Sequence, residues 1–115
     1  MKHTIDATNK RLGRVASKAA SLLMGKNRSN FVRNAAPKDV IVEIMNGAKC
    51  VIPRKKMRDT KYTRYSGYPG GLRIMSMEQV VAKKGYGGLF RIAVRGMLPN
   101  NKLRPGMLKR LIVKV

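Results

Sequence analysis

Apolar positions at two different spacings alternate along the chain and predict a mixed α/β fold. In residues 12–23 the apolar side chains recur every three or four positions, which is typical of a helix with one buried face, and Gly25 is a natural helix end. Residues 39–45 are β-branched and almost continuously apolar, as in a strand covered on both faces. Two further short strands are expected at 4–7 and 111–115. Strands that alternate with helices favour parallel pairing, because a parallel pair needs a crossover connection.

Helix signals continue in the C-terminal half, where glycine and proline interrupt them. Residues 76–85 are expected to form a short helix capped by Ser76, and the apolar positions of 89–99 predict a second one. Residues 103–111 predict a brief third helix.

Turn-forming residues divide the middle of the chain. Residues 49–52 predict a short strand that would pair with residues 39–45 as a hairpin through a turn at 46–47. Residues 54–73 are interpreted as a functional loop, because glycine and proline are concentrated at 66–71. Strand order cannot be read from these patterns, but an α/β layered domain follows from them.

Length and cysteine usage narrow the class of protein. One domain spanning residues 1–115 is expected, because 43% hydrophobic residues can fill a core at this length. The lone Cys50 cannot form an internal disulfide or share a metal with a second cysteine, so a reducing, cytoplasmic compartment fits best. The N-terminal residues lack an apolar signal core. The sequence also has no run of eighteen apolar residues, which a membrane-spanning helix would need.

Charge is the feature that points to a partner. The chain has 26 lysines and arginines against 5 acids, a net charge of +21, and residues 79–115 contain nine cations and no acid. A compact domain with such a charge repels itself, so a polyanion is expected to supply the missing negative charge. The chain is therefore interpreted first as a nucleic-acid binder.

Tyrosines threaded among cations favour RNA as the polyanion. Residues 54–73 contain seven basic residues, one acid and three tyrosines. Cations can bind phosphates while tyrosine rings stack on unpaired bases, which is worth about 1–3 kcal/mol per base. For each tyrosine alone, return of its ring to the core is an equally good interpretation. Arg91 and Arg95 lie four residues apart on one helix face, where they repel unless phosphates lie against them.

Groups suited to catalysis or metal binding are few. His3, Cys50 and the five acids are the whole inventory for most such chemistry, and no second carboxylate stands at a catalytic spacing from Asp6 or Glu43. Those two acids are expected to pair with neighbouring cations. The glycines at 67–71 do not form a phosphate-loop motif. We therefore expect no enzymatic activity, no catalytic residue, no metal and no cofactor.

Three stretches together resemble a known family. They are residues 5–14, residues 61–72 with the tyrosine and glycine passage, and residues 93–99 with the motif Ala-Val-Arg-Gly-Met-Leu-Pro, which continues to 107–111. Their order and spacing are similar to the bacterial large-subunit ribosomal protein thirteen family along nearly the whole chain. At Thr63 and Arg64 the sequence departs from many members, which carry histidines there.

The resemblance implies a three-layer α/β/α domain with a mainly parallel four-stranded sheet and basic loop extensions. It also implies a structural, non-enzymatic role in translation, as an rRNA-binding constituent of the large ribosomal subunit that supports ribosome assembly beside neighbouring ribosomal proteins. Together with the basic stretches above, it gives an expected RNA-binding set of Lys10, Arg11, Arg14, Lys18, Lys26, Arg28, Lys55, Lys56, Arg58, Lys61, Tyr62, Arg64, Tyr65, Tyr68, Arg73, Arg91, Arg95, Lys102, Arg104, Lys109 and Arg110.

Three other classes of function share some of these features. A general nucleic-acid-binding or nucleoid-associated protein shares the charge and is the main alternative. A small nucleotide-using enzyme would need a phosphate motif and a catalytic group, neither of which is found. A cationic membrane-active protein would need a long, clean apolar helix face, which the charge-studded helices lack.

Overall fold

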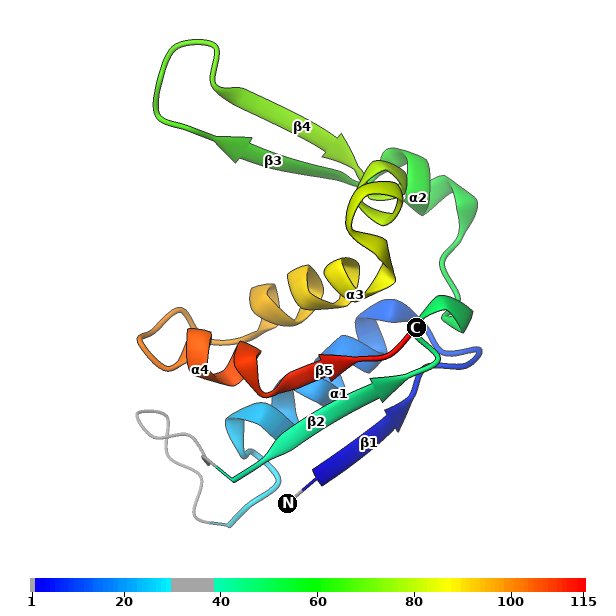
Figure 1. Cartoon of the computed structure of the whole chain (residues 1–115), viewed down its shortest axis with the longest axis vertical. Helices are drawn as coiled ribbons and strands as arrows, with labels where there is room; N and C mark the ends of the chain where they lie inside the picture. Colours follow the sequence, from blue (N-terminus) through cyan, green and yellow to red (C-terminus); the bar gives the residue numbers. More distant parts are fainter. Residues whose placement is uncertain (1, 30–38) are drawn as a thin grey trace.

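The computed structural model describes residues 2–29 and 39–115 and shows a mixed α/β fold (Figure 1). In chain order its elements are β1 (Lys2–Asp6), α1 (Leu12–Met24), β2 (Ile41–Met45), the 3₁₀ helix η1 (Gly47–Lys49), α2 (Arg54–Asp59), β3 (Lys61–Tyr65), β4 (Leu72–Ser76), α3 (Met77–Met97), α4 (Arg104–Lys109) and β5 (Leu111–Val113).

The main sheet has three parallel strands in the order β1-β2-β5. The predicted parallel pairing is confirmed, but the prediction of a fourth strand in this sheet is wrong. The expected hairpin between residues 39–45 and 49–52 is also wrong, because Asn46 adopts a left-handed conformation (φ 57°) and the chain then enters η1. Of the predicted strand at 49–52, Val51 makes an isolated parallel bridge to Arg11.

Helices α1 and α3 pack against each other and lie on one face of the sheet. The crossovers β1 to β2 and β2 to β5 move in the same direction across the sheet, and crossovers of one hand then place their helices on the same face. In the described part of the chain no helix covers the other face, so the expected three-layer arrangement is not formed there. Ile41 and Met45 of β2 are exposed on that face, and the expectation that this strand is covered on both faces is therefore wrong.

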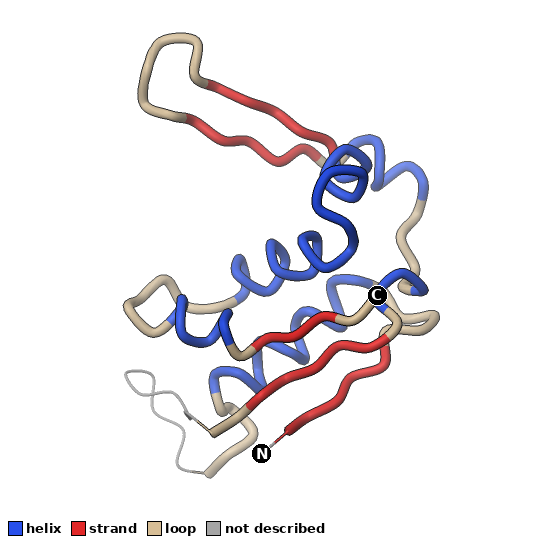
Figure 2. Tube along the Cα trace, viewed as in Figure 1, coloured by secondary structure: helices blue, strands red, loops and turns tan. Residues whose placement is uncertain are grey.

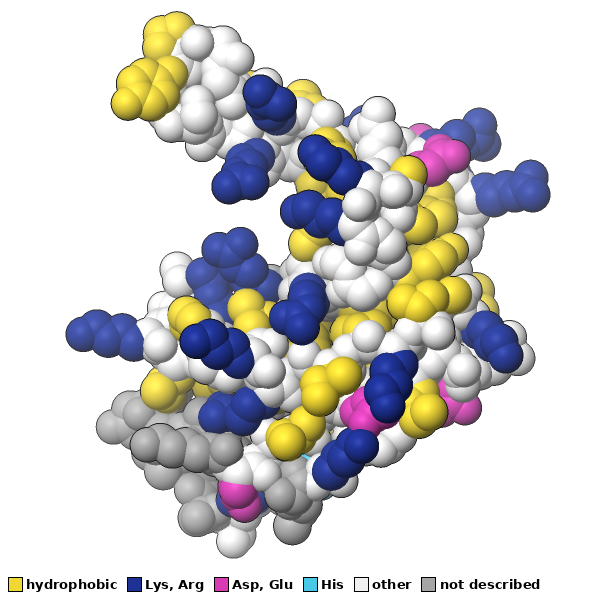
Figure 3. Space-filling model, viewed as in Figure 1, with side chains coloured by type: hydrophobic (Ala, Val, Ile, Leu, Met, Phe, Trp, Pro, Cys, Tyr) yellow, Lys and Arg dark blue, Asp and Glu magenta, His cyan; other side chains and the backbone are white. Residues whose placement is uncertain are grey.

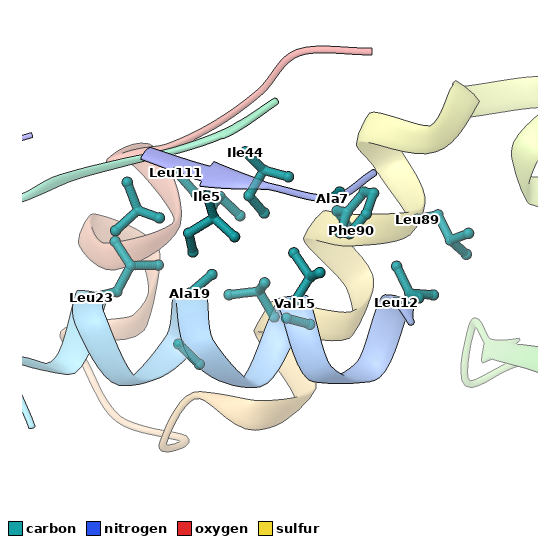
Figure 4. Close-up of a cluster of buried hydrophobic side chains, with 14 of the residues drawn as sticks. Ile5, Ala7, Leu12, Val15, Ala19, Leu23, Ile44, Leu89, Phe90 and Leu111 are labelled. Atoms are coloured by element: carbon teal, nitrogen blue, oxygen red, sulfur yellow. The ribbon is translucent and has the colours of Figure 1, made fainter. Parts of the chain in front are cut away.

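The core lies between the sheet and the two helices. Helix α1 contributes Leu12, Val15, Ala19 and Leu23, which Figure 4 shows pointing toward the strands. Its alanines leave room for α3, whose Phe90 is fully buried. The helix ends at Gly25 in a left-handed conformation (φ 80°), as expected, with its amide donating to Leu22 O and Ser21 O.

Helix α3 consists of two helical segments that meet at a sharp bend, which confirms the two separate helices expected at 76–85 and 89–99. Its start is confirmed: the Ser76 hydroxyl accepts from the Gln79 amide, and the Gln79 side chain accepts from the Ser76 amide. The bend is at Gly85, whose backbone (φ 74°, ψ 179°) is not helical.

The segment interpreted as a loop is instead α2 followed by the antiparallel β3–β4 hairpin, which extends away from the body (Figure 2). The glycines and proline that suggested a loop form only the turn at its tip, where Gly67 and Gly70 have positive φ.

Candidate nucleic-acid interface

Most lysines and arginines in the described part of the chain form no ion pair with an acid. In the ranges 2–29 and 39–115, ion pairs join Lys2 and Lys114 to Glu43 (2.5 and 2.9 Å) and Arg28 to Asp39 (3.3 Å). The expectation that Glu43 pairs with cations is confirmed. Its carboxylate is buried, and the hydrogen bonds from Lys2, then from Lys114, lower the pKa of Glu43. Figure 3 shows lysine and arginine side chains scattered over the visible face of the molecule, both on the body and on the hairpin.

The acid of β1 has a structural partner set of its own. The Asp6 carboxylate accepts hydrogen bonds from the Thr8 hydroxyl (2.7 Å), the Thr8 amide (3.0 Å) and the Asn46 side chain (3.2 Å). These bonds, those from Thr8 first, lower the pKa of Asp6 to about 2. The carboxylate therefore ties the end of β1 to the end of β2 and is negatively charged at neutral pH.

Four predicted residues at the start of α1 come together around a surface pocket of about 490 Å³. Lys10, Arg11, Arg14 and Lys18 line it, beside Ile5, Asn9 and Val15. Arg14 and Lys18 lie on the exposed side of α1, while Val15 turns to the core, and Lys10 and Arg11 are exposed just before the helix begins. The pocket is a concave, strongly positive surface.

The hairpin separates the three tyrosines of the sequence pattern. Tyr62 packs against the core, and burial raises the pKa of Tyr62. Tyr65 and Tyr68 are exposed. Arg64 lies directly opposite Arg73 across the two strands. The prediction that a tyrosine ring packs against the core is therefore confirmed for Tyr62, while Tyr65 and Tyr68 are accessible to a partner.

The predicted cations of the C-terminal third do not all have the same surroundings. The Arg91 guanidinium donates to Leu108 O (3.4 Å) and to Leu111 O (3.1 Å), so it links α3 to the end of α4 and the start of β5. Arg110 is half-buried, and its Nε has no hydrogen-bond partner among the described residues. The remaining predicted cations of this third lie at the surface to different degrees: Arg95, Lys102 and Lys109 are exposed, and Arg104 is half-buried.

The other predicted cations lie on separate elements. Lys55, Lys56 and Arg58 are exposed on α2, Lys61 is exposed on β3, and Lys26 is exposed just after α1. The structure therefore brings the α1 group together and pairs Arg64 with Arg73, but it distributes the rest over the surface.

Two surface residues escaped the sequence reasoning. Leu72 and Ile74 are exposed on β4, at alternate positions on one side of the hairpin. The placing of Leu72 and Ile74 on either side of Arg73 was the available signal, but the glycines just before it favoured a loop.

Chemistry other than binding has little support at these surfaces. Within the described residues, no group of three or more His, Cys, Asp or Glu side chains could hold a metal ion. Burial raises the pKa of the Cys50 thiol, which disfavours the reactive thiolate. None of the helices in the described ranges is both long and apolar enough to cross a membrane.

Comparison with known proteins places these features in a family. Residues 1–113 match the family model described as Ribosomal protein L13. The chain is 40% identical to the large ribosomal subunit protein uL13 of Pelotomaculum thermopropionicum over 111 residues, which cover 96% of this chain and 76% of that protein. It is 44% identical to the protein of the same name from Thermus thermophilus over 109 residues, which cover 95% of this chain and 76% of the relative.

Proposed function

This chain belongs to the ribosomal protein L13 family, and from that premise we propose that it is a structural, non-enzymatic constituent of the large ribosomal subunit that binds large-subunit rRNA. It acts in translation as part of the ribosome and contacts neighbouring large-subunit proteins. Its place of action is the large ribosomal subunit in the cytoplasm. The names of the relatives support a place in the large subunit, and the positive charge of the chain supports RNA as its partner.

The observation that best supports RNA binding is the distribution of unneutralised cations. They line the α1 pocket, the hairpin and the end of α3 with α4, on a flat body measuring 45 × 37 × 17 Å. Such a body can touch several RNA segments with different edges. We infer that it supports assembly by holding separated rRNA segments together, with recognition resting on phosphates and shape more than on base sequence.

The salt dependence of binding to deproteinised large-subunit rRNA tests the electrostatic part of this proposal. If six to ten phosphates are contacted, affinity falls by about 10³- to 10⁵-fold between 50 and 200 mM salt, by analogy with duplex DNA. An affinity that does not change with salt would contradict it.

Sedimentation of a cell extract separates this function from that of a general nucleic-acid or nucleoid protein. A ribosomal constituent migrates with the large subunit through a sucrose gradient. A nucleoid-associated protein migrates with DNA and is released by nuclease treatment of the DNA.

A further inference from the structure

The β3–β4 hairpin has two faces, and the register of its strands defines them. Tyr65 lies opposite Leu72, and Thr63 lies opposite Ile74. Because alternate residues of a strand point to the same side, these four side chains share one face, which we call the apolar face. The residues between them form the other face.

The apolar face is unusually open to solvent. Tyr65 is 64% exposed, and Leu72 and Ile74 are each 56% exposed. Tyr68, in the turn beyond them, is 75% exposed. Exposed large apolar side chains that are neighbours across two strands form a continuous patch, and such patches mark binding surfaces.

The other face, which we call the arginine face, carries Tyr62, Arg64, Arg73 and Met75. Tyr62 and Met75 pack against the core, so this face is turned toward the body of the protein. Arg64 and Arg73 follow beyond them, directly opposite each other, and like charges in that position repel. The hairpin, residues 61–76, has no acid to relieve the repulsion.

The space between the hairpin and the body is hollow and positively charged. Figure 3 shows a notch between the hairpin and the body, with Lys and Arg side chains on both of its sides. An anion of extended shape, such as an RNA backbone, fits a notch with this charge. The apolar face lies on the opposite side of the hairpin from the arginine face.

The chemistry of the apolar face points to unpaired bases. The outer surface of an RNA duplex offers phosphates and riboses, which give a tyrosine ring and two aliphatic side chains little to bind. An unstacked base offers a flat apolar face that stacks on an aromatic ring. Lys61 lies on the same side at the base of the hairpin, where it can meet the phosphate of such a nucleotide.

We propose that the hairpin inserts between two parts of the rRNA: the arginine face holds phosphates in the notch, and the apolar face receives unpaired bases. The proposal rests on the proposed function and names the kind of RNA that each face takes. It predicts that the two faces contribute to binding through different physical interactions.

The two interactions separate in the salt dependence of binding to deproteinised large-subunit rRNA. The double variant Arg64→Gln/Arg73→Gln neutralises fewer phosphates, so its plot of log affinity against log salt is shallower, by about 1 for each phosphate that the arginines no longer bind. The double variant Tyr65→Ser/Ile74→Ser binds about 5- to 150-fold more weakly, as expected when one base can no longer stack, with the slope of the wild type.

Two matched control variants remove the same groups elsewhere. Lys49→Gln/Arg54→Gln removes two exposed cations outside the expected RNA-binding set, and Ile41→Ser/Ile112→Ser removes two exposed apolar side chains from the open face of the sheet. Each control is expected to bind like the wild type at matched salt. Circular dichroism of each variant checks that it remains folded.

Single substitutions of Tyr65 distinguish stacking from general apolar contact. Tyr65→Phe keeps the ring and is expected to bind like the wild type, whereas Tyr65→Leu keeps an apolar side chain and is expected to bind more weakly. Wild-type affinity in both Tyr65→Leu and the Tyr65→Ser/Ile74→Ser variant would overturn the proposal. So would a shallower slope in that double variant.

Photocrosslinking in intact large subunits identifies what covers the apolar face. A benzophenone amino acid at position 65 is expected to crosslink to unpaired rRNA nucleotides. Crosslinks to a neighbouring protein, or to paired nucleotides, would overturn the proposal while leaving rRNA binding by the rest of the protein intact. If the wild type itself showed no salt-dependent binding to rRNA, the proposed function would fail instead.

Discussion

At the scale of single residues, Glu43 has the most unusual surroundings in the described structure. It is the one acid whose side chain is buried, in the central strand β2, and lysines from both edges of the sheet reach it: Lys2 on β1 and Lys114 just after β5. Both lysines keep more than half of their side chains in solvent. The carboxylate therefore links all three strands through interactions that need it to be charged.

Replacing Glu43 with Gln is expected to destabilise the protein in a pH-dependent way. Hydrogen bonds from the lysines hold the pKa of Glu43 below its ordinary value of 4.5, so its contribution is present at neutral pH and disappears as pH falls through the folded pKa. Urea unfolding should show a difference between wild type and Glu43→Gln at pH 7 that shrinks in acid. A difference that grows in acid would contradict this account.

Gly85 matters at the boundary between residue and element, because it bends α3. Its backbone (φ 74°, ψ 179°) lies in a region that is essentially restricted to glycine, where other residues cost about 1–3 kcal/mol. Nothing lies within 4 Å of where its Cβ would be, so the strain would come from the backbone alone. The first part of α3 follows the hairpin directly, and the bend therefore sets the direction of the hairpin.

We expect Gly85→Ala to lower the free energy of unfolding by about 1–3 kcal/mol. Gly96→Ala is the matched control on the same helix: it also meets open space, has no positive φ, and should raise the free energy of unfolding by up to about 1 kcal/mol. Urea unfolding measures both. Equal effects of the two substitutions would show that the bend is not maintained by the glycine.

At the scale of elements, the capping box of Ser76 and Gln79 fixes where the hairpin ends and α3 begins. Ser76→Ala is expected to cost about 1 kcal/mol of unfolding free energy, because the Gln79 amide loses its acceptor. Ser17→Ala, at an exposed interior position of α1, is the control and should be neutral or slightly stabilising. An equally large loss of unfolding free energy in Ser17→Ala would show that the cap is not the cause of the loss in Ser76→Ala.

Elements with a strong local signal were predictable from the sequence, and those that depend on distant residues were not. Residues 12–23 show helical spacing and a glycine stop, and α1 follows them closely. Residues 49–52 have a strand-like composition, but the left-handed Asn46 and η1 direct them away from β2. The hairpin was missed because its turn glycines favoured a loop and because Lys61–Tyr65 shows no regular alternation of apolar and polar residues.

The candidate interface was predictable in the same measure. Charge and tyrosines indicated which segments could meet RNA, since both are visible in composition. The burial of Tyr62 and the hydrogen bonds of Arg91 to carbonyl oxygens depend on residues far away in the chain, so no local pattern could show them. The pocket at α1 likewise joins a strand, a turn and a helix.

At the scale of the whole molecule, a net charge of +21 sets the response to salt. Without RNA, added salt screens the repulsion among cations, whose range is about 10 Å at 0.1 M, so Tm is expected to rise from low to moderate salt. In the presence of rRNA, Tm is expected to fall as salt is added, because salt weakens the binding that stabilises the folded state. Thermal unfolding monitored by circular dichroism for the free protein, and by limited proteolysis for the complex, tests both signs. Destabilisation of the free protein by salt would show that repulsion does not limit its stability.

The hydrogen bonds of Arg91 show how a cation can hold elements of the fold together and still attract an anion. Its guanidinium joins α3 to α4 and β5 by donating to carbonyl oxygens, which carry no net charge. An ion pair in that place would have fastened the same elements but cancelled the positive charge. Because carbonyl oxygens hold α3, α4 and β5 together, the acid-free residues 79–115 keep their full positive charge. These elements are therefore in place without a polyanion and can still attract one.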